Sequence, residues 1–132
     1  MVRKIKHTEQ KLLTDVELEL MTVLWKLGEG SVADVLASLP SERKLAYTSV
    51  STILRILEQK EILHTRKEGR GHIYIPKLPK SEYEAKAVQH IVNNVFDGTP
   101  VALAKQLLGS GTLRAQDLDE LKALIDKIGG KK

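Results

Sequence analysis

The 132-residue chain carries 21 Lys and Arg residues against 17 Asp and Glu residues, and it contains no cysteine. A disulfide framework, a thiolate metal site and a cysteine nucleophile are therefore excluded. No segment has the roughly 20 apolar residues of a membrane span and the N-terminus lacks the apolar core of a secretion signal, so we expect a cytoplasmic protein with no membrane partner.

The first helix is predicted to follow a basic, polar and mobile arm over residues 1–13. Thr14 and Glu17 have the spacing of a capping box, in which each side chain satisfies a free amide group of the first turn. Gly28 is expected to end this helix. Trp25 lies on an apolar face of the helix, where we expect it to pack against the start of a later helix at residue 81.

A short second helix is predicted over residues 32–39, after a cap at Ser31, and a third helix runs to about residue 59. The third helix places four apolar residues at helical spacing toward the core: Val50, Ile53, Leu54 and Leu57. Its other face shows hydroxyl groups and one Arg, namely Thr48, Ser49, Ser51, Thr52 and Arg55. Such a face suits close approach to phosphates and base edges, and Lys44 and Tyr47 just before it suit phosphate contacts.

Residues 62–68 and 72–76 flank a Gly-Arg-Gly sequence and predict a β-hairpin. Its basic residues are Arg66, Lys67, Arg70 and His72, which suit a phosphate strand or a minor groove. Small residues on a helix also suit packing against another helix, and a charge cluster is also typical of a solvated surface. The two features together favour binding to double-stranded DNA.

The prolines of residues 76–79 predict a boundary between a DNA-binding domain, residues 1–79, and a helical domain, residues 80–132. Further caps at Ser81 and Thr99 begin two helices, and a last helix spans about residues 114–128. Three amphipathic helices in so short a segment are too few to bury a core of their own, which indicates a second copy of the chain as partner. The expected dimer interface comprises Val88, Val92, Val95, Phe96, Leu103, Leu107, Leu118, Leu121, Leu124, Ile125 and Ile128.

The predicted fold class is therefore mainly α with a small β-hairpin: a winged helix-turn-helix followed by a three-helix dimerisation region. The sequence resembles the penicillinase-repressor family of bacterial winged-helix repressors, also called BlaI/MecI/CopY, in residues 13–18, 23–25, 45–57 and 67–70 and in the helical tail. The resemblance implies a homodimer that represses resistance or stress genes from an inverted-repeat operator. It further implies that Thr48, Ser49, Thr52 and Arg55 enter the major groove and that Arg66, Lys67 and Arg70 lie in the wing.

Two departures from that family concern how the repressor leaves DNA. Copper-responsive members sense metal through C-terminal cysteines, which this chain lacks. Members inactivated by proteolysis are cut at an Asn-Phe bond, where this chain has Gln106 and Leu107. These departures argue against metal-switched release and against cleavage at that bond, and they leave a regulatory protease and the inducing signal open.

No enzyme and no cofactor are expected, because the sequence contains no phosphate-binding loop and no nucleophile with a base. The four histidines, His7, His64, His72 and His90, lack metal-ligand spacing and indicate no metal site. Two alternatives stay open. One is a winged-helix adaptor that binds another protein, and the other is a regulator released from DNA by a small molecule bound near Trp25 and Tyr83.

Overall fold

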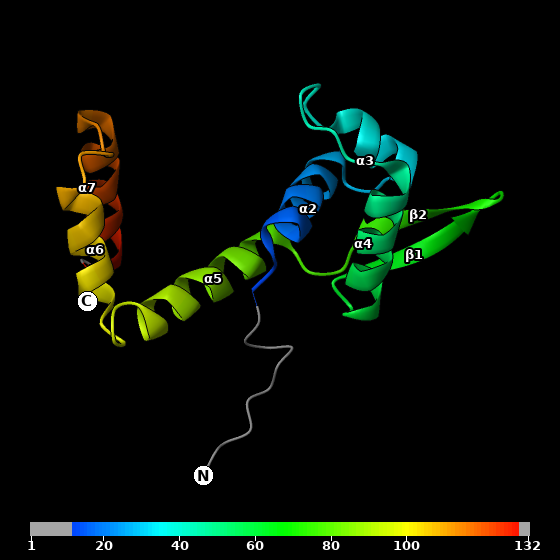
Figure 1. Cartoon of the computed structure of the whole chain (residues 1–132). Coiled ribbons are helices and arrows are strands. Elements are labelled where there is room, and N and C mark those ends of the chain that lie inside the picture. The colour runs from blue at the N-terminus through cyan, green and yellow to red at the C-terminus, as the bar shows by residue number, and fades with distance from the viewer. Residues whose placement is uncertain (1–11, 130–132) are drawn as a thin grey trace, which may run out of the picture. The chain divides into compact units, whose positions relative to one another are not determined.

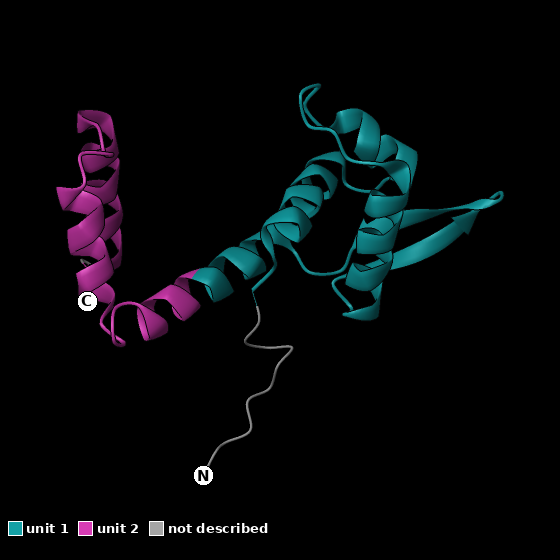
Figure 2. Ribbon diagram, in the orientation of Figure 1, with its two compact units in different colours: residues 1–87 teal, residues 88–132 magenta. Residues whose placement is uncertain are grey.

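The computed structural model describes residues 12–129, and the chain divides into two compact units, Met1–Ala87 and Val88–Lys132 (Figure 1, Figure 2). The division falls inside helix α5 (Lys80–Asn94), later than the boundary expected at residue 79. His7 and most of the predicted arm lie outside the described residues. Across the described range, no helix is both long enough and apolar enough to span a membrane.

Helix α2 (Asp15–Leu27) begins with the predicted capping box. Thr14 Oγ1 accepts a hydrogen bond from Glu17 N at 3.2 Å, and Thr14 N donates to Glu17 Oε1 at 2.9 Å. The helix ends at Gly28, where a φ of 89° is a left-handed conformation that side chains disfavour. Both ends of the first helix are confirmed as predicted.

Helices α3 (Val32–Ser38) and α4 (Tyr47–Gln59) complete the helical part of the first unit. Ser31 caps α3 in a second capping box with Asp34, as its position in the sequence predicted. The side chains that this unit buries completely come mostly from the helices: Leu20, Met21, Leu24, Val35, Val50, Leu54 and Leu57. Ile53, the fourth residue of the predicted inner face of α4, packs partly buried against them.

Strands β1 (Leu63–Glu68) and β2 (Gly71–Pro76) form the predicted antiparallel hairpin. The link between α2 and α3 adds a contact that the sequence analysis did not foresee. Gly30 pairs with Tyr74 of β2, donating to its carbonyl at 3.0 Å and accepting from its N–H at 2.7 Å. The hairpin is therefore fixed to the helices through the open edge of β2.

Trp25 packs against the first part of α5, as predicted. Its ring lies 5.9 Å from that of Tyr83, and its Nε1 donates to the Leu78 carbonyl at 2.9 Å. The Tyr83 hydroxyl accepts a hydrogen bond from Leu13 N at 3.1 Å, and the Leu13 side chain packs on the core. The expectation that the mobile arm extends to residue 13 is therefore wrong, because Leu13 has both apolar and polar partners.

The second unit contains the end of α5, α6 (Pro100–Gly109) and α7 (Ala115–Gly129). The cap expected at Ser81 is wrong, because α5 already begins at Lys80. The Pro79 carbonyl accepts from the Glu82 and Tyr83 N–H groups, at 3.1 Å each. Thr99 is the N-cap of α6 as predicted, but its hydroxyl forms no capping hydrogen bond.

Glu17 is a buried charged residue that joins the start of α2 to the end of α4. Its carboxylate accepts from Lys60 Nζ at 2.8 Å, and its side chain is 9% exposed. Burial alone would raise the pKa of Glu17, but the hydrogen bonds from Lys60 and Thr14 outweigh burial and lower this pKa below 4.5. The capping residue therefore also holds a long-range ion pair.

Replacing Lys60 by Met should lower the free energy of unfolding by about 1–3 kcal/mol at neutral pH, because the buried carboxylate loses its cation. In the wild type, the lowered pKa of Glu17 stabilises the fold above about pH 4.5, and this contribution is lost as pH falls through the folded-state pKa. In the variant the two lowering contributions of Lys60 are lost, so the pKa of Glu17 rises relative to the wild type and the difference between the two chains should shrink in acid.

Urea unfolding between about pH 3.5 and pH 7, at one chain concentration, measures this difference. Lys77→Met is the matched control, because it removes the same charge from an exposed pair with Glu61 and should change stability by less than about 1 kcal/mol. A difference between wild type and Lys60→Met that stays constant with pH would contradict the assignment to Glu17.

Candidate nucleic-acid interface

Helix α4 has a buried face and an exposed face. Its three fully buried residues, Val50, Leu54 and Leu57, fix the helix on the core, so the residues on the opposite side of the helix point outward. Short hydroxyl side chains let a helix backbone approach DNA closely, and an Arg guanidinium matches the two acceptors of guanine. Four of the five residues predicted for the outer face are exposed, namely Thr48, Ser49, Thr52 and Arg55, whereas Ser51 is half-buried.

The N-terminus of α4 has no side-chain cap. Its N-cap residue is Ala46, whose side chain forms no hydrogen bond, whereas Thr14 and Ser31 cap the two preceding helices. Lys44 and Tyr47 flank this end of the helix, and both are exposed. Free N–H groups and the positive end of the helix dipole favour an anion such as phosphate at this position.

The wing, residues 63–76, turns one of its faces toward α4. Thr65 Oγ1 of β1 donates to the Glu58 carboxylate of α4 at 3.1 Å, and Thr65 pairs with Tyr74 of β2. Lys67 pairs with His72, two positions further along the same ladder. Because alternate residues of a strand share a face, Lys67 and His72 lie on the face that also contacts α4.

The tip of the wing carries Arg70 beside Gly69, whose φ of 60° is a left-handed conformation that glycine adopts without strain. Among residues 12–129, four of the predicted cations form no ion pair with a carboxylate, and all four are exposed: Lys44, Arg55, Lys67 and Arg70. Cations without an acidic partner are available to phosphate.

A polar recess of about 410 Å³ lies between α4 and the wing. Three predicted residues meet there, and three that the sequence analysis did not single out complete the lining: Ser51, Arg55 and His72, with Glu58, Thr65 and Tyr74. Burial raises the pKa of the Tyr74 hydroxyl, and the charge of Glu58 adds to this effect. Glu58 follows Arg55 by three residues, so helical spacing alone was a signal that both line one surface.

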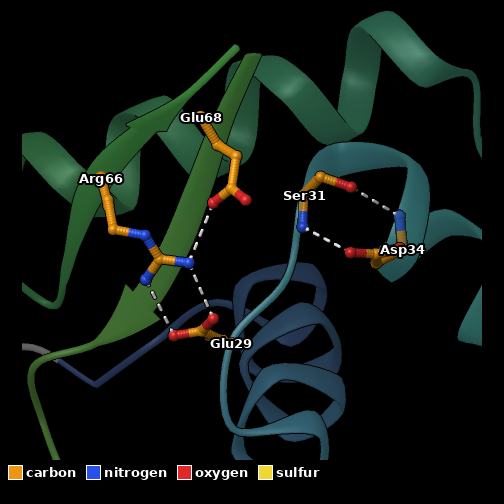
Figure 3. A network of polar contacts seen from close by, with 5 residues as sticks. All are labelled: Glu29, Ser31, Asp34, Arg66 and Glu68. Carbon is orange, nitrogen blue, oxygen red and sulfur yellow. Dashed lines mark hydrogen bonds and ion pairs between the residues drawn. The ribbon is translucent and has the colours of Figure 1, made fainter.

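Arg66 has a different environment from the other basic residues of the wing. Its guanidinium donates to both carboxylate oxygens of Glu29, at 3.2 and 3.0 Å, and to Glu68 at 3.1 Å (Figure 3). The hydrogen bonds from Arg66 are the main cause of a lowered pKa at Glu29, and they raise the pKa of Arg66 itself. Arg66 therefore already has two anionic partners within the chain.

The sequence pattern of the penicillinase repressor family matches residues 13–127. The chain belongs to the penicillinase repressor family. It is 26% identical to the penicillinase repressor of Bacillus licheniformis over 120 residues, 91% of this chain and 94% of that protein. It is 35% identical to the transcriptional regulator BlaI of Mycobacterium tuberculosis (strain CDC 1551 / Oshkosh) over 74 residues, 55% of this chain and 54% of that protein.

A solution structure of the Bacillus licheniformis BlaI monomer in complex with the blaP half-operator is 31% identical to this chain. The match covers 56% of this chain and 90% of the BlaI chain, with a TM-score of 0.48. Membership in the penicillinase repressor family confirms the predicted resemblance. It also confirms the winged helix-turn-helix with its two-stranded hairpin and the prediction of a DNA-binding transcriptional repressor.

The residues expected at a dimer interface lie in the second half of α5, in the turn that follows it, and in α6 and α7 of this penicillinase repressor family member. Val92 is buried within the single chain, at 4% exposure, and Phe96 and Leu103 are half-buried. The others are exposed apolar side chains: Val88, Val95, Leu107, Leu118, Leu121, Leu124, Ile125 and Ile128. Most of the predicted set thus lacks a partner inside the described chain.

Proposed function

We propose that the chain represses transcription as a homodimer on an inverted-repeat operator, with α4 of each copy in a major groove and the wing beside the flanking phosphates. The observation that carries this proposal is the exposed hydroxyl and Arg face of α4, which continues through the polar recess to the unpaired cations of the wing. On this proposal Arg55 and the hydroxyl residues contact bases, whereas Lys44, Lys67 and Arg70 contact phosphates. His72 lines the recess together with Arg55.

The second unit supports a homodimer, because α6 and α7 contain no buried residue in the single chain. Ile125 is 65% exposed and Ile128 is 74% exposed. A helix of about 15 residues is marginal in water without packing, and contiguous exposed apolar surface usually marks an interface. A second copy offers the same apolar surface, so two-fold pairing covers the exposed apolar side chains of both copies at once.

A two-fold dimer requires DNA with matching symmetry. Helix-turn-helix dimers bind half-sites about one helical turn apart, so we expect a pseudo-palindromic operator with that spacing. The target genes proposed from the family resemblance are resistance or stress genes. Because the target is chromosomal DNA, we place the protein in the cytoplasm.

Selection of duplexes from a random-sequence pool by the full chain tests the function directly. The selected sequences should contain an inverted repeat, and anisotropy titration should show a preference of about a thousandfold or more over a scrambled duplex, with affinity falling steeply with salt. If no sequence is enriched and binding is weak and nearly independent of salt, the protein-adaptor alternative replaces this proposal.

The ligand-released alternative has less support from the first unit. The cavity beside Tyr83 measures about 130 Å³, whereas pockets for small molecules usually measure about 300–1,000 Å³. Trp25 is occupied by Tyr83 and the Leu78 carbonyl. The packing around Trp25 is therefore that of a structural contact.

Arg55→Ala and Arg70→Ala should weaken DNA binding in different ways. Loss of Arg55 should reduce the preference for the selected duplex by about 1–3 kcal/mol, because a base contact disappears. Loss of Arg70 should weaken selected and scrambled duplexes alike and reduce the salt slope by about one phosphate contact. Titrations of both variants on both duplexes at several salt concentrations separate the roles, and equal effects of the two variants on every duplex would contradict this division.

A further inference from the structure

The register of the wing places Arg66 on the face that does not contact α4. Arg66 alternates along β1 with Thr65 and Lys67, and the Thr65 hydrogen bond to Glu58 identifies the face toward the helix. Arg66 pairs across the ladder with Ile73 and points away from that face. It therefore does not share the surface on which Lys67 and His72 lie.

The ion pair between Arg66 and Glu29 crosses the sheet. Gly30 is hydrogen-bonded to Tyr74 along the free edge of β2, so the link between α2 and α3 lies beside β2 and β1 lies on its other side. Arg66 starts from β1 and reaches Glu29 on that link. One guanidinium thus connects the first strand of the wing, across the second, to the helical part of the unit.

The anchoring point is itself fixed. Two residues after Glu29, Ser31 and Asp34 form the capping box of α3, with hydrogen bonds of 3.0 and 3.1 Å (Figure 3). An isolated two-stranded hairpin is marginally stable, so contacts between its strands and the helical part of the unit determine the direction in which its tip points. The Arg66 network supplies such a contact on the face opposite α4.

The charge of the network does not suit a phosphate. One guanidinium lies between two carboxylates, Glu29 and Glu68, and the group as a whole carries a net negative charge. A phosphate that approached Arg66 would meet both carboxylates or would have to displace them. Arg70 and Lys67, which have no ion pair among the described residues, lack this obstacle.

We propose that Arg66 is a positioning residue, which holds the wing against the link between α2 and α3 by binding Glu29 and Glu68 and does not bind a DNA phosphate itself. The proposal rests on DNA binding by this domain. It separates Arg66 from the basic residues with which the sequence grouped it. It also gives Glu29, an acidic residue near the wing, a favourable role in DNA binding.

Glu29→Gln distinguishes positioning from direct contact by the sign of its effect. The substitution removes a negative charge, so if Arg66 were a phosphate contact held back by Glu29, every duplex would bind more tightly. If Arg66 positions the wing, the loss of its bidentate partner weakens binding of the selected duplex. We expect a weakening of about 3–10-fold with an unchanged salt slope.

The experiment uses the full chain and a duplex that the wild type selects from a random pool, titrated at several salt concentrations. Arg66→Ala should match Glu29→Gln in size, and the double variant should be no weaker than either single one, because both break one contact. Arg66→Lys should also weaken binding, since an ammonium keeps the charge but cannot bridge both carboxylates with a planar fork. Glu84→Gln removes the same charge from an exposed site on α5 and should bind like the wild type.

Three results would overturn the proposal: tighter binding by Glu29→Gln, a salt slope flattened by about one contact in Arg66→Ala, or wild-type affinity in both variants. Thermal unfolding of each variant shows that the chain is folded at the assay temperature. Arg70→Ala is the reference for a lost phosphate contact, because it should weaken all duplexes and reduce the salt slope. If the wild-type chain itself selects no sequence, the result contradicts the proposed operator function. That outcome is distinct from the three results that would overturn the role of Arg66.

Discussion

Ile125→Glu should convert the proposed homodimer to a monomer. In the single chain Ile125 is 65% exposed, within a stripe of α7 that also includes Leu121 and Ile128. A two-fold interface contains the substituted residue twice, so it loses two apolar side chains and gains two desolvated carboxylates. We expect the association free energy to weaken by about 4 kcal/mol or more, which is about a thousandfold in the dissociation constant.

Sedimentation at micromolar concentration measures the mass of each chain. Ala123→Glu is the matched control, because it adds the same charge to the same helix at an exposed position away from the stripe. The control should remain a dimer. A dimeric Ile125→Glu chain would show that this stripe is not the interface.

DNA binding adds a second readout for Ile125→Glu. The wing and α4 belong to the first unit, so affinity for a duplex with one half-site should be unchanged. Affinity for two half-sites should fall by orders of magnitude, because the second copy no longer binds at the high effective concentration that dimerisation provides. Equal losses on both duplexes would indicate damage to the first unit.

Local signals predicted most of the fold of the first unit. The capping boxes at Thr14 and Ser31 depend on residues only three positions apart, and both are present. The inner face of α4 followed from apolar spacing within one helix, and the wing followed from two short β-rich segments around glycines. The cap expected at Ser81 was wrong because α5 begins one residue earlier, at Lys80, and the Pro79 carbonyl accepts its first hydrogen bonds.

Contacts between distant residues were not predictable from these signals. Glu17 satisfies its capping box, yet its second partner, Lys60, comes from the far end of α4. Gly30 looks like part of a helix stop, and only the folded chain shows that it pairs with β2. A single sequence specifies charges and spacing, but it does not specify which of many carboxylates a given cation meets.

In the candidate site, too, local features were predictable from the sequence and contacts between distant residues were not. Residues of the exposed α4 face were identified because the chemistry of a helix face can be read from its own sequence. Glu58 and Tyr74 line the recess with Arg55, but they belong to it only because the wing packs beside α4. Arg66 lies one position from Lys67, and the alternation of the strand puts the two residues on opposite faces.

Leu54→Ala should lower the free energy of unfolding by about 2–5 kcal/mol. Leu54 is completely buried in α4, directly before Arg55, and its removal leaves a cavity in the centre of the core. Ile56→Ala is the matched control, because it shortens an apolar side chain of the same helix that is 38% exposed, and it should have a much smaller effect. Urea unfolding at fixed chain concentration measures both.

The DNA binding of Leu54→Ala then separates the two faces of α4. Leu54 contacts only the core, so at a temperature where the variant is folded, its preference for the selected duplex over the scrambled one should equal that of the wild type. The selected duplex should also raise its Tm, because DNA binds only the folded state. Arg55→Ala should show the reverse, with wild-type stability and reduced preference. Two results would contradict this separation of the buried and exposed faces of α4. One is a Leu54→Ala chain as stable as the wild type, and the other is a folded Leu54→Ala chain that has lost its preference for the selected duplex.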